Sequence, residues 1–200
     1  MAEIFTLFPQ VIYKSKLQNH ENLKERLADD LIKKFKANPN QSFAWADLCD
    51  SWQEDATPYI DIIATELHPH IKQFLYHFEF PEFRYKLDSW FNVHTNNMYQ
   101  ETHAHMHGPT VLCGIYYMQL SSKDNPVIFK PHSEMYSSHL RIMNLNPSHP
   151  LFAESSLEVL NIKEGDLLLF TPDSKHLVPR SKEKHDGYRI SLSFNLQKTF

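Results

Sequence analysis

The spacing of apolar residues predicts two amphipathic helices in the first part of the chain. Residues 20–37 carry leucine or phenylalanine at every fourth position from 23 to 35, with charged residues between them. A second stretch with helical spacing begins near Pro58. Proline suits the first turn of a helix but disturbs its interior, so we expect Pro69 to kink this second helix or split it in two.

After Pro81 the pattern changes to short runs of β-branched and aromatic residues separated by turn residues. About seven strands after a helical region indicate one α+β domain that is mainly β. We therefore expect a single domain over 1–200, with a helical part at 1–80 and a β core at 81–200. The core would be a β-sandwich or small barrel with the helices packed against one sheet.

Charge and composition exclude several classes of protein. The 200 residues include 20 Lys+Arg and 24 Asp+Glu, a net charge of −4, which lacks the basic footprint of a nucleic-acid binder. No apolar run is long enough to span a membrane, and no export signal is visible. Cys49 and Cys113 belong to no paired motif, which favours a reduced, cytoplasmic protein. The unusual feature is the presence of 13 histidines.

Three of these histidines alternate along residues 99–107. In an extended strand, alternate side chains share a face, so Glu101, His103, His105 and His107 would line one side. Two histidines separated by one residue on a strand can bind one metal ion, but a third ligand must come from elsewhere. The alternative is a half-exposed strand whose histidines are merely polar.

Two downstream residues complete a candidate site. His176 opens a strand after a buried-looking strand and a Pro-Asp-Ser turn, and Arg189 lies in the apolar strand GYRISLSFN. A buried guanidinium needs an anion, which is either one of the chain's own acids or the carboxylate of a ligand. Ser191 projects to the same face as Arg189 and can add a hydroxyl donor.

The segments HAHMH, CGIYYMQL, EGDLLLFTPDSKH and RISLSFN together resemble the iron(II)- and 2-oxoglutarate-dependent oxygenase superfamily, in particular a branch found in bacteria and phages. IFTLFPQVIY and SWQEDA extend the resemblance over most of the chain. It implies a double-stranded β-helix, a jelly-roll or cupin-like pair of antiparallel sheets with a metal near one mouth. This agrees with the strands expected from the pattern alone.

The resemblance also implies the metal ligands. The HxH pair and His176 would hold Fe(II), and the family's spacing from Asn92 favours His103 with His105, while counting back from the next strand favours His105 with His107. Most members of the superfamily use two histidines and a carboxylate. Here a histidine stands in place of the carboxylate, which leaves the site one charge more positive and favours a dianion. Glu101 is a further candidate for the missing carboxylate.

For the cosubstrate, the resemblance implies that Arg189, assisted by Ser191, binds the distal carboxylate of 2-oxoglutarate. Tyr117 matches a position from which prolyl hydroxylases offer a phenol to that carboxylate, and Asn92 matches a family motif position. The implied enzyme is a dioxygenase that couples 2-oxoglutarate decarboxylation to hydroxylation of a C–H bond. Its partners would be dioxygen and a small-molecule or peptide substrate, with the oligomeric state left open.

Two other functions compete with this hypothesis. One is a non-catalytic β-domain whose metal site is inert or holds zinc, and the other is a cupin-like dioxygenase that uses iron without 2-oxoglutarate. An arginine whose side chain points into the metal cavity would argue against both functions, because neither supplies an anionic ligand for it. Substrate contacts are expected from the loop at 131–156, whereas Trp90 and Tyr116 are expected to pack in the core.

Overall fold

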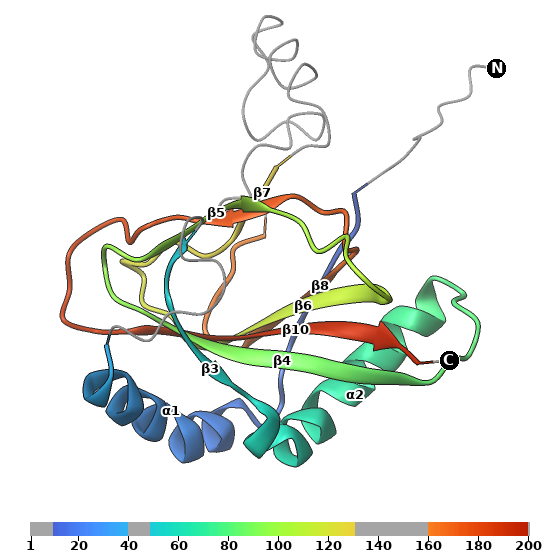
Figure 1. The fold of residues 1–200 in the computed structure, drawn as a ribbon, viewed down its shortest axis with the longest axis horizontal. Helices are drawn as coiled ribbons and strands as arrows, with labels where there is room; N and C mark the ends of the chain where they lie inside the picture. The colour runs from blue at the N-terminus through green and yellow to red at the C-terminus, as the bar shows by residue number, and fades with distance from the viewer. Residues whose placement is uncertain (1–9, 40–48, 131–159, 200) are drawn as a thin grey trace, which may run out of the picture.

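A computed structural model, which describes residues 10–39, 49–130 and 160–199, shows two facing antiparallel sheets with both helices on the outer face of the larger sheet (Figure 1). The elements in chain order are β1 (Ile12–Lys16), α1 (His20–Ala37), β2 (Cys49–Asp50), β3 (Trp52–Asp55), the 3-10 turn η1 (Thr57–Tyr59), α2 (Ile60–His77), β4 (Tyr85–His94), β5 (Tyr99–His103), β6 (Thr110–Gln119), β7 (Ile128–Phe129), β8 (Asp166–Phe170), β9 (His176–Val178) and β10 (Arg189–Lys198).

The larger sheet has six strands in the order β1-β8-β6-β10-β4-β3, and the smaller has four in the order β2-β5-β9-β7. The first 80 residues are therefore not only helical: β1 and β3 form the two edges of the larger sheet, and β2 forms an edge of the smaller one. The expected mainly β double-stranded β-helix, with helices on one sheet, is confirmed. The two sheets stay separate rather than closing into one barrel. Of the helices that the structure describes, none is long and apolar enough to cross a membrane.

Strand β10 at the centre of the larger sheet sends alternate side chains to two different environments. Ile190, Leu192 and Phe194 are buried in the cluster that also contains the apolar faces of α1 and α2. Arg189 and the two serines that follow at alternate positions line a cavity on the other face of the sheet. The period of two in RISLSFN thus separates a helix-packing face from a polar face between the sheets.

The first predicted helix is confirmed, and the second differs at Pro69. Helix α1 buries the leucines and phenylalanine of its predicted stripe. Of the two expected outcomes, a kink or a split, the split does not occur, because α2 runs through Pro69 as one helix. Pro69 is exposed, while Leu67 and Ile71 on either side of it are fully buried. Packing on both sides of the proline therefore holds one continuous helix.

Gly114 gives a test of how β6 and β10 pack. It pairs with Phe194, and a Cβ at position 114 would lie within 3.0 Å of three atoms of the Phe194 ring. Gly114→Ala should therefore destabilise the fold by about 1–3 kcal/mol through overpacking, measured by urea unfolding. The Phe194→Leu background removes the ring and should shrink that penalty. An equal penalty in both backgrounds would contradict the packing described here.

Candidate metal centre and carboxylate site

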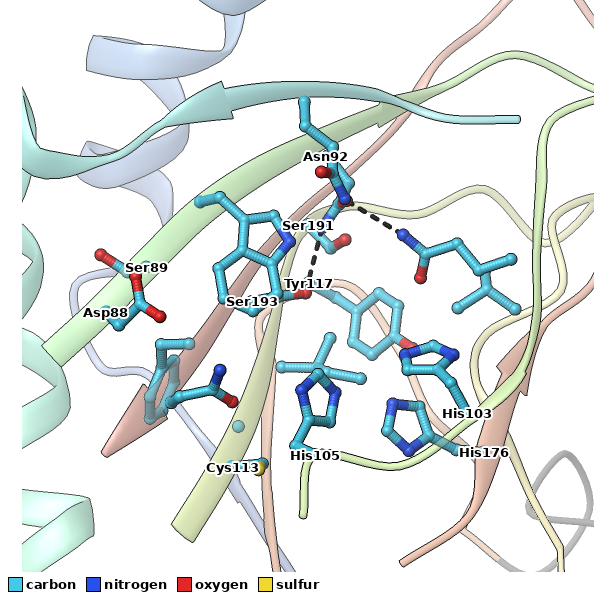
Figure 2. Close-up of a pocket in the computed structure, with 18 of the residues that line it drawn as sticks. Asp88, Ser89, Asn92, His103, His105, Cys113, Tyr117, His176, Ser191 and Ser193 are labelled. Carbon is cyan, nitrogen blue, oxygen red and sulfur yellow. Dashed lines mark hydrogen bonds between the residues drawn. The ribbon is translucent and has the colours of Figure 1, made fainter. Parts of the chain in front are cut away.

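A cavity of about 320 Å³ lies between the two sheets. Its lining includes the residues that the sequence analysis singled out for metal or cosubstrate binding except Glu101, namely Asn92, His103, His105, His107, Tyr117, His176, Arg189 and Ser191. Several of them are drawn in Figure 2. Because they come from strands of both sheets and from the segment that follows β5, their convergence depends on the fold rather than on any single motif.

His103, His105 and His176 form a group whose ligand atoms all lie within 4.8 Å of one another. His103 and His176 are paired in register between β5 and β9, with ring centroids 4.4 Å apart. The ring of His105 stacks on that of His176 at 5.2 Å. Figure 2 shows the three imidazoles gathered at one side of the cavity. Three neutral imidazoles converging in this way are a donor set that suits Fe(II) or Zn²⁺.

The histidine segment does not form the uninterrupted strand that alternation predicted. β5 ends at His103, and its register with β9 shifts between Gln100 and His103. His105 lies beyond the strand, where its backbone N–H donates to the Pro172 carbonyl at 2.8 Å. The shift brings Gln100 rather than Glu101 to the cavity lining. A strand irregularity and a loop anchor, not simple alternation, therefore place His105 beside His103.

Glu101 and His107 lie outside the group of converging ligand atoms. Both side chains are exposed, and the His107 ring centroid is 6.0 Å from that of His105. The backbone carbonyl of Glu101 accepts a hydrogen bond from His103 Nδ1 at 2.7 Å. Glu101 therefore contributes to the site through its main chain, by orienting an imidazole.

Backbone carbonyls fix the tautomers of two of the three imidazoles. His176 Nδ1 donates to the Ser174 carbonyl at 2.8 Å, as His103 Nδ1 does to Glu101. A carbonyl can only accept, so Nδ1 carries the proton and Nε2 keeps its lone pair for a metal. His105 Nδ1 is buried and has no hydrogen-bond partner among the described residues. The arrangement fits a bound cation.

Burial keeps these imidazoles neutral. It lowers the pKa of His105 to about 3, with a further contribution from the neighbouring His103 and His107. It also lowers the pKa of His176 to about 3, and that of His103 falls for the same reason. All three rings are therefore unprotonated at neutral pH, which is the form that binds a metal ion.

Arg189 is 3% exposed and lies in the same cavity. Its guanidinium donates to the carbonyls of Asn125 and Pro179 and to His94 Nδ1. No acid of the described residues forms an ion pair with it; Asp124, which acts on it electrostatically, is itself bonded to His185 at 2.9 Å. The positive charge is thus held by neutral acceptors and has no carboxylate partner, which favours an anionic ligand.

Ser191 stands in the cross-strand register between Tyr117 on β6 and Asn92 on β4. The Tyr117 hydroxyl accepts a hydrogen bond from the Val127 backbone N–H at 2.8 Å, and burial raises the pKa of Tyr117 to about 12. The phenol therefore keeps its proton and can donate it. Three cavity-facing groups, from Arg189, Ser191 and Tyr117, thus offer hydrogen bonds to one anion.

Asn92 is engaged with protein groups. Its Nδ2 donates to Ser193 Oγ at 3.0 Å, and its Oδ1 accepts from Gln53 at 3.0 Å and Gln100 at 3.2 Å. Because Gln100 lies on β5, this amide links the larger sheet to the smaller one. Its role in this structure is to hold the two walls of the cavity together.

His94 is a cavity residue that the sequence analysis missed. Its Nδ1 accepts a hydrogen bond from Arg189, which cannot be an acceptor, so the proton of this ring lies on Nε2. Nε2 is buried and has no partner among the described residues. Burial, with the nearby Arg189 charge, lowers the pKa of His94 well below its usual value and keeps the ring neutral. Alternation with Asn92 along β4 was the signal that could have found it.

Trp90 also differs from its expected place. It lines the cavity rather than packing in the core, with its ring centroid 6.3 Å from that of His105. Tyr116 does lie in the core, as expected. The loop at 131–156, expected to contact substrate, lies outside the described residues.

Two facing sheets with a histidine cluster and a buried, acid-free arginine between them define a jelly-roll metalloprotein that takes an anionic ligand. Comparison with known protein families identifies the family within this class. The family model described as "Putative 2OG-Fe(II) oxygenase" matches residues 88–195, more than half of the chain. The chain belongs to this 2-oxoglutarate/Fe(II) oxygenase family. No curated protein matches the sequence.

Solved structures show the same fold at low sequence identity. The chain is similar to a prolyl-4-hydroxylase from Pseudomonas putida (TM-score 0.64, 9% identity, 94% of this chain and 93% of that one). It is also similar to a viral collagen prolyl hydroxylase from Paramecium Bursaria Chlorella virus-1, in complex with 2-oxoglutarate (0.61, 12%, 94% and 96%). A third is HygX from Streptomyces hygroscopicus with nickel and 2-oxoglutarate bound (0.56, 12%, 94% and 83%).

Metal titration tests which histidines bind the ion. His105→Ala and His176→Ala should each weaken Mn(II) binding by about 100-fold or more, measured by the paramagnetic resonance signal of free Mn(II), because each removes one of the converging imidazoles. His107→Ala is the matched control and should bind Mn(II) like the unchanged protein. Loss of binding in His107→Ala with retention in His103→Ala would reverse the assignment.

Proposed function

We propose that this oxygenase hydroxylates a C–H bond of a small-molecule or peptide substrate and that His103, His105 and His176 hold its iron. Bound iron, with 2-oxoglutarate and dioxygen, supplies the oxidation of the substrate and the decarboxylation of the cosubstrate to succinate. The chain's own residues bind and orient the reactants and keep them between two sheets, away from bulk water. The prolyl hydroxylases among the structural neighbours support hydroxylation as the outcome.

The observation that carries the proposal is that a buried arginine without a carboxylate partner shares one cavity with a three-histidine cluster. A dianion that reaches from the metal to Arg189 would satisfy both features at once. Ser191 and Tyr117 would donate to the same distal carboxylate. The other end of 2-oxoglutarate, the keto acid, is a metal chelator.

His94 extends this carboxylate site. In the tautomer that Arg189 imposes, His94 Nε2–H is a buried donor with no partner among the described residues. A carboxylate has room for several hydrogen bonds, so it can accept from the imidazole as well as from the guanidinium. We assign to His94 two roles: it orients the guanidinium through Nδ1 and donates to the distal carboxylate through Nε2.

A thermal-shift experiment that crosses Mn(II) with 2-oxoglutarate tests the site as a whole. With Mn(II) bound, 2-oxoglutarate at about 100 times its Kd should add about 2.7 kcal/mol, a rise in Tm of about 5–10 °C. Without the metal the rise should be much smaller, because the keto acid has nothing to chelate. A metal-binding β-domain without catalysis, or a dioxygenase independent of 2-oxoglutarate, would show no effect of the keto acid.

Arg189→Ala should keep the Mn(II) response and lose the response to 2-oxoglutarate, with succinate production falling in parallel. Removing charged hydrogen bonds of about 1.5–3 kcal/mol weakens cosubstrate binding by about 10- to 150-fold. Arg180→Ala is the matched control, since Arg180 is exposed and stacks on Tyr99 outside the cavity lining. Unchanged 2-oxoglutarate binding in Arg189→Ala would refute the carboxylate site.

His94→Phe should raise the KM for 2-oxoglutarate by about tenfold while changing kcat less, since the ring acts on the cosubstrate carboxylate and not on the metal. Succinate release against 2-oxoglutarate concentration measures the split. The exposed His77→Ala on α2 is the control. A fall in kcat at unchanged KM would show that His94 has a different role.

A further inference from the structure

The end of the cavity away from Arg189 is acidic. Asp55 on β3 pairs in register with Trp90 on β4, and Asp88 lies two residues before Trp90, so all three share the cavity face of the larger sheet. Figure 2 shows Asp88 across the cavity from His103 and His176, with His105 between them. Asp88 therefore lies on the far side of His105 from His103 and His176 (Figure 2), and Asp55 and Trp90 share its face of the sheet.

The described part of the chain supplies no cation to these carboxylates. Asp55 Oδ1 accepts hydrogen bonds from the backbone N–H and hydroxyl of Thr57 at 2.9 and 2.7 Å. Asp88 Oδ2 accepts one hydrogen bond, from Gln197 Nε2 at 3.3 Å. Neither forms an ion pair with a described lysine, arginine or histidine. Both residues are exposed to solvent, and the described protein groups that contact their carboxylates are neutral donors.

Asn195 supplies a second, independent indication of a ligand. It pairs in register with Asp88 and alternates with Arg189 and Ser191, so it lies on the cavity face of β10. The residue is 2% exposed, and its Oδ1 is buried with no hydrogen-bond partner among the described residues. An unpaired buried acceptor costs free energy unless a ligand donates to it. This acceptor stands beside a carboxylate that also lacks a cation.

Trp90 connects this acidic end to the metal centre. Its ring lies 6.3 Å from that of His105, and it is the direct cross-strand neighbour of Asp55. A tryptophan face attracts organic cations, and the attraction grows where water is excluded. A positively charged group bound here would hold the rest of its molecule next to the metal ligands.

We propose that Asp55, Asp88, Trp90 and Asn195 form the subsite that binds a protonated amine or guanidinium group of the oxidised substrate. The cavity then has two complementary ends: Arg189 binds the cosubstrate carboxylate, and the acidic end binds the cation of the second reactant. This inference rests on the proposed oxygenase function. It adds the class of substrate, which that function leaves open.

Titration calorimetry on the full chain loaded with Mn(II) and 2-oxoglutarate tests the subsite with matched pairs of probes. L-Lysine is compared with L-norleucine, L-arginine with L-citrulline, and 1,4-diaminobutane with glucitol as a neutral polyol. At least one cation should bind about tenfold or more tightly than its neutral counterpart, the effect of one charged hydrogen bond. The 2-oxoglutarate-dependent rise in Tm, read on the same sample, reports the proposed function separately.

Single substitutions test which residue causes the preference for the cation. Asp88→Asn should weaken binding of the cation about tenfold or more and so remove the preference over its neutral partner, whereas Asp88→Glu should retain the preference. Asp186 is an exposed acid outside the cavity lining, so Asp186→Asn is the control and should leave the preference unchanged. All three should keep the response to Mn(II) with 2-oxoglutarate. The inference is overturned if every cation binds no better than its neutral partner, if glucitol binds best, or if Asp88→Asn keeps the preference. If the unchanged protein shows no 2-oxoglutarate-dependent rise in Tm, the oxygenase proposal itself is wrong.

Discussion

The structure depends on the two-residue alternation along β10. Because this strand is central in the larger sheet, one set of its side chains must satisfy the helices, and Ile190, Leu192 and Phe194 do so. The other set is free of that packing demand and can be polar. Arg189 and the residues alternating with it therefore face the space between the sheets, where a buried guanidinium would be unfavourable without a partner. The same strand stabilises the fold and supplies residues of the proposed anion site.

The second constraint is the pairing of β5 with β9. His103 and His176 are more than 70 positions apart, and only the register of these two short strands sets their rings against each other. The backbone carbonyls of Glu101 and Ser174 then turn both imidazoles so that Nε2 is left for a metal. Main-chain acceptors suit this purpose, since their position follows from the strand and needs no further side chain.

Sequence patterns predicted the features that depend on local periodicity or on residue chemistry. The stripe of α1, the polar face of RISLSFN and the burial of Arg189 in the cavity belong to this group. The rest depends on contacts between distant segments. The register shift in β5 and the anchoring of His105 on Pro172 leave no local signal, and β1 and β3 are short edge strands. The split expected at Pro69 is absent for the same reason, because tertiary packing outweighed the local preference of proline.

The proposed use of three histidines, without a carboxylate, to bind the metal fits a cavity whose charges are separated. Three neutral imidazoles would leave the charge of a bound cation undiminished, and Arg189 adds a further positive charge in the same cavity. A dianionic cosubstrate balances both, so the ligand substitution and the acid-free arginine support each other. Had Asp88 or Asp55 instead lain beside Arg189, each would have competed with the cosubstrate for it. With Asp55 beside Trp90 and Asp88 two residues before it, the proposed anion site has no protein carboxylate and the acidic end is left for the proposed reactant of opposite charge.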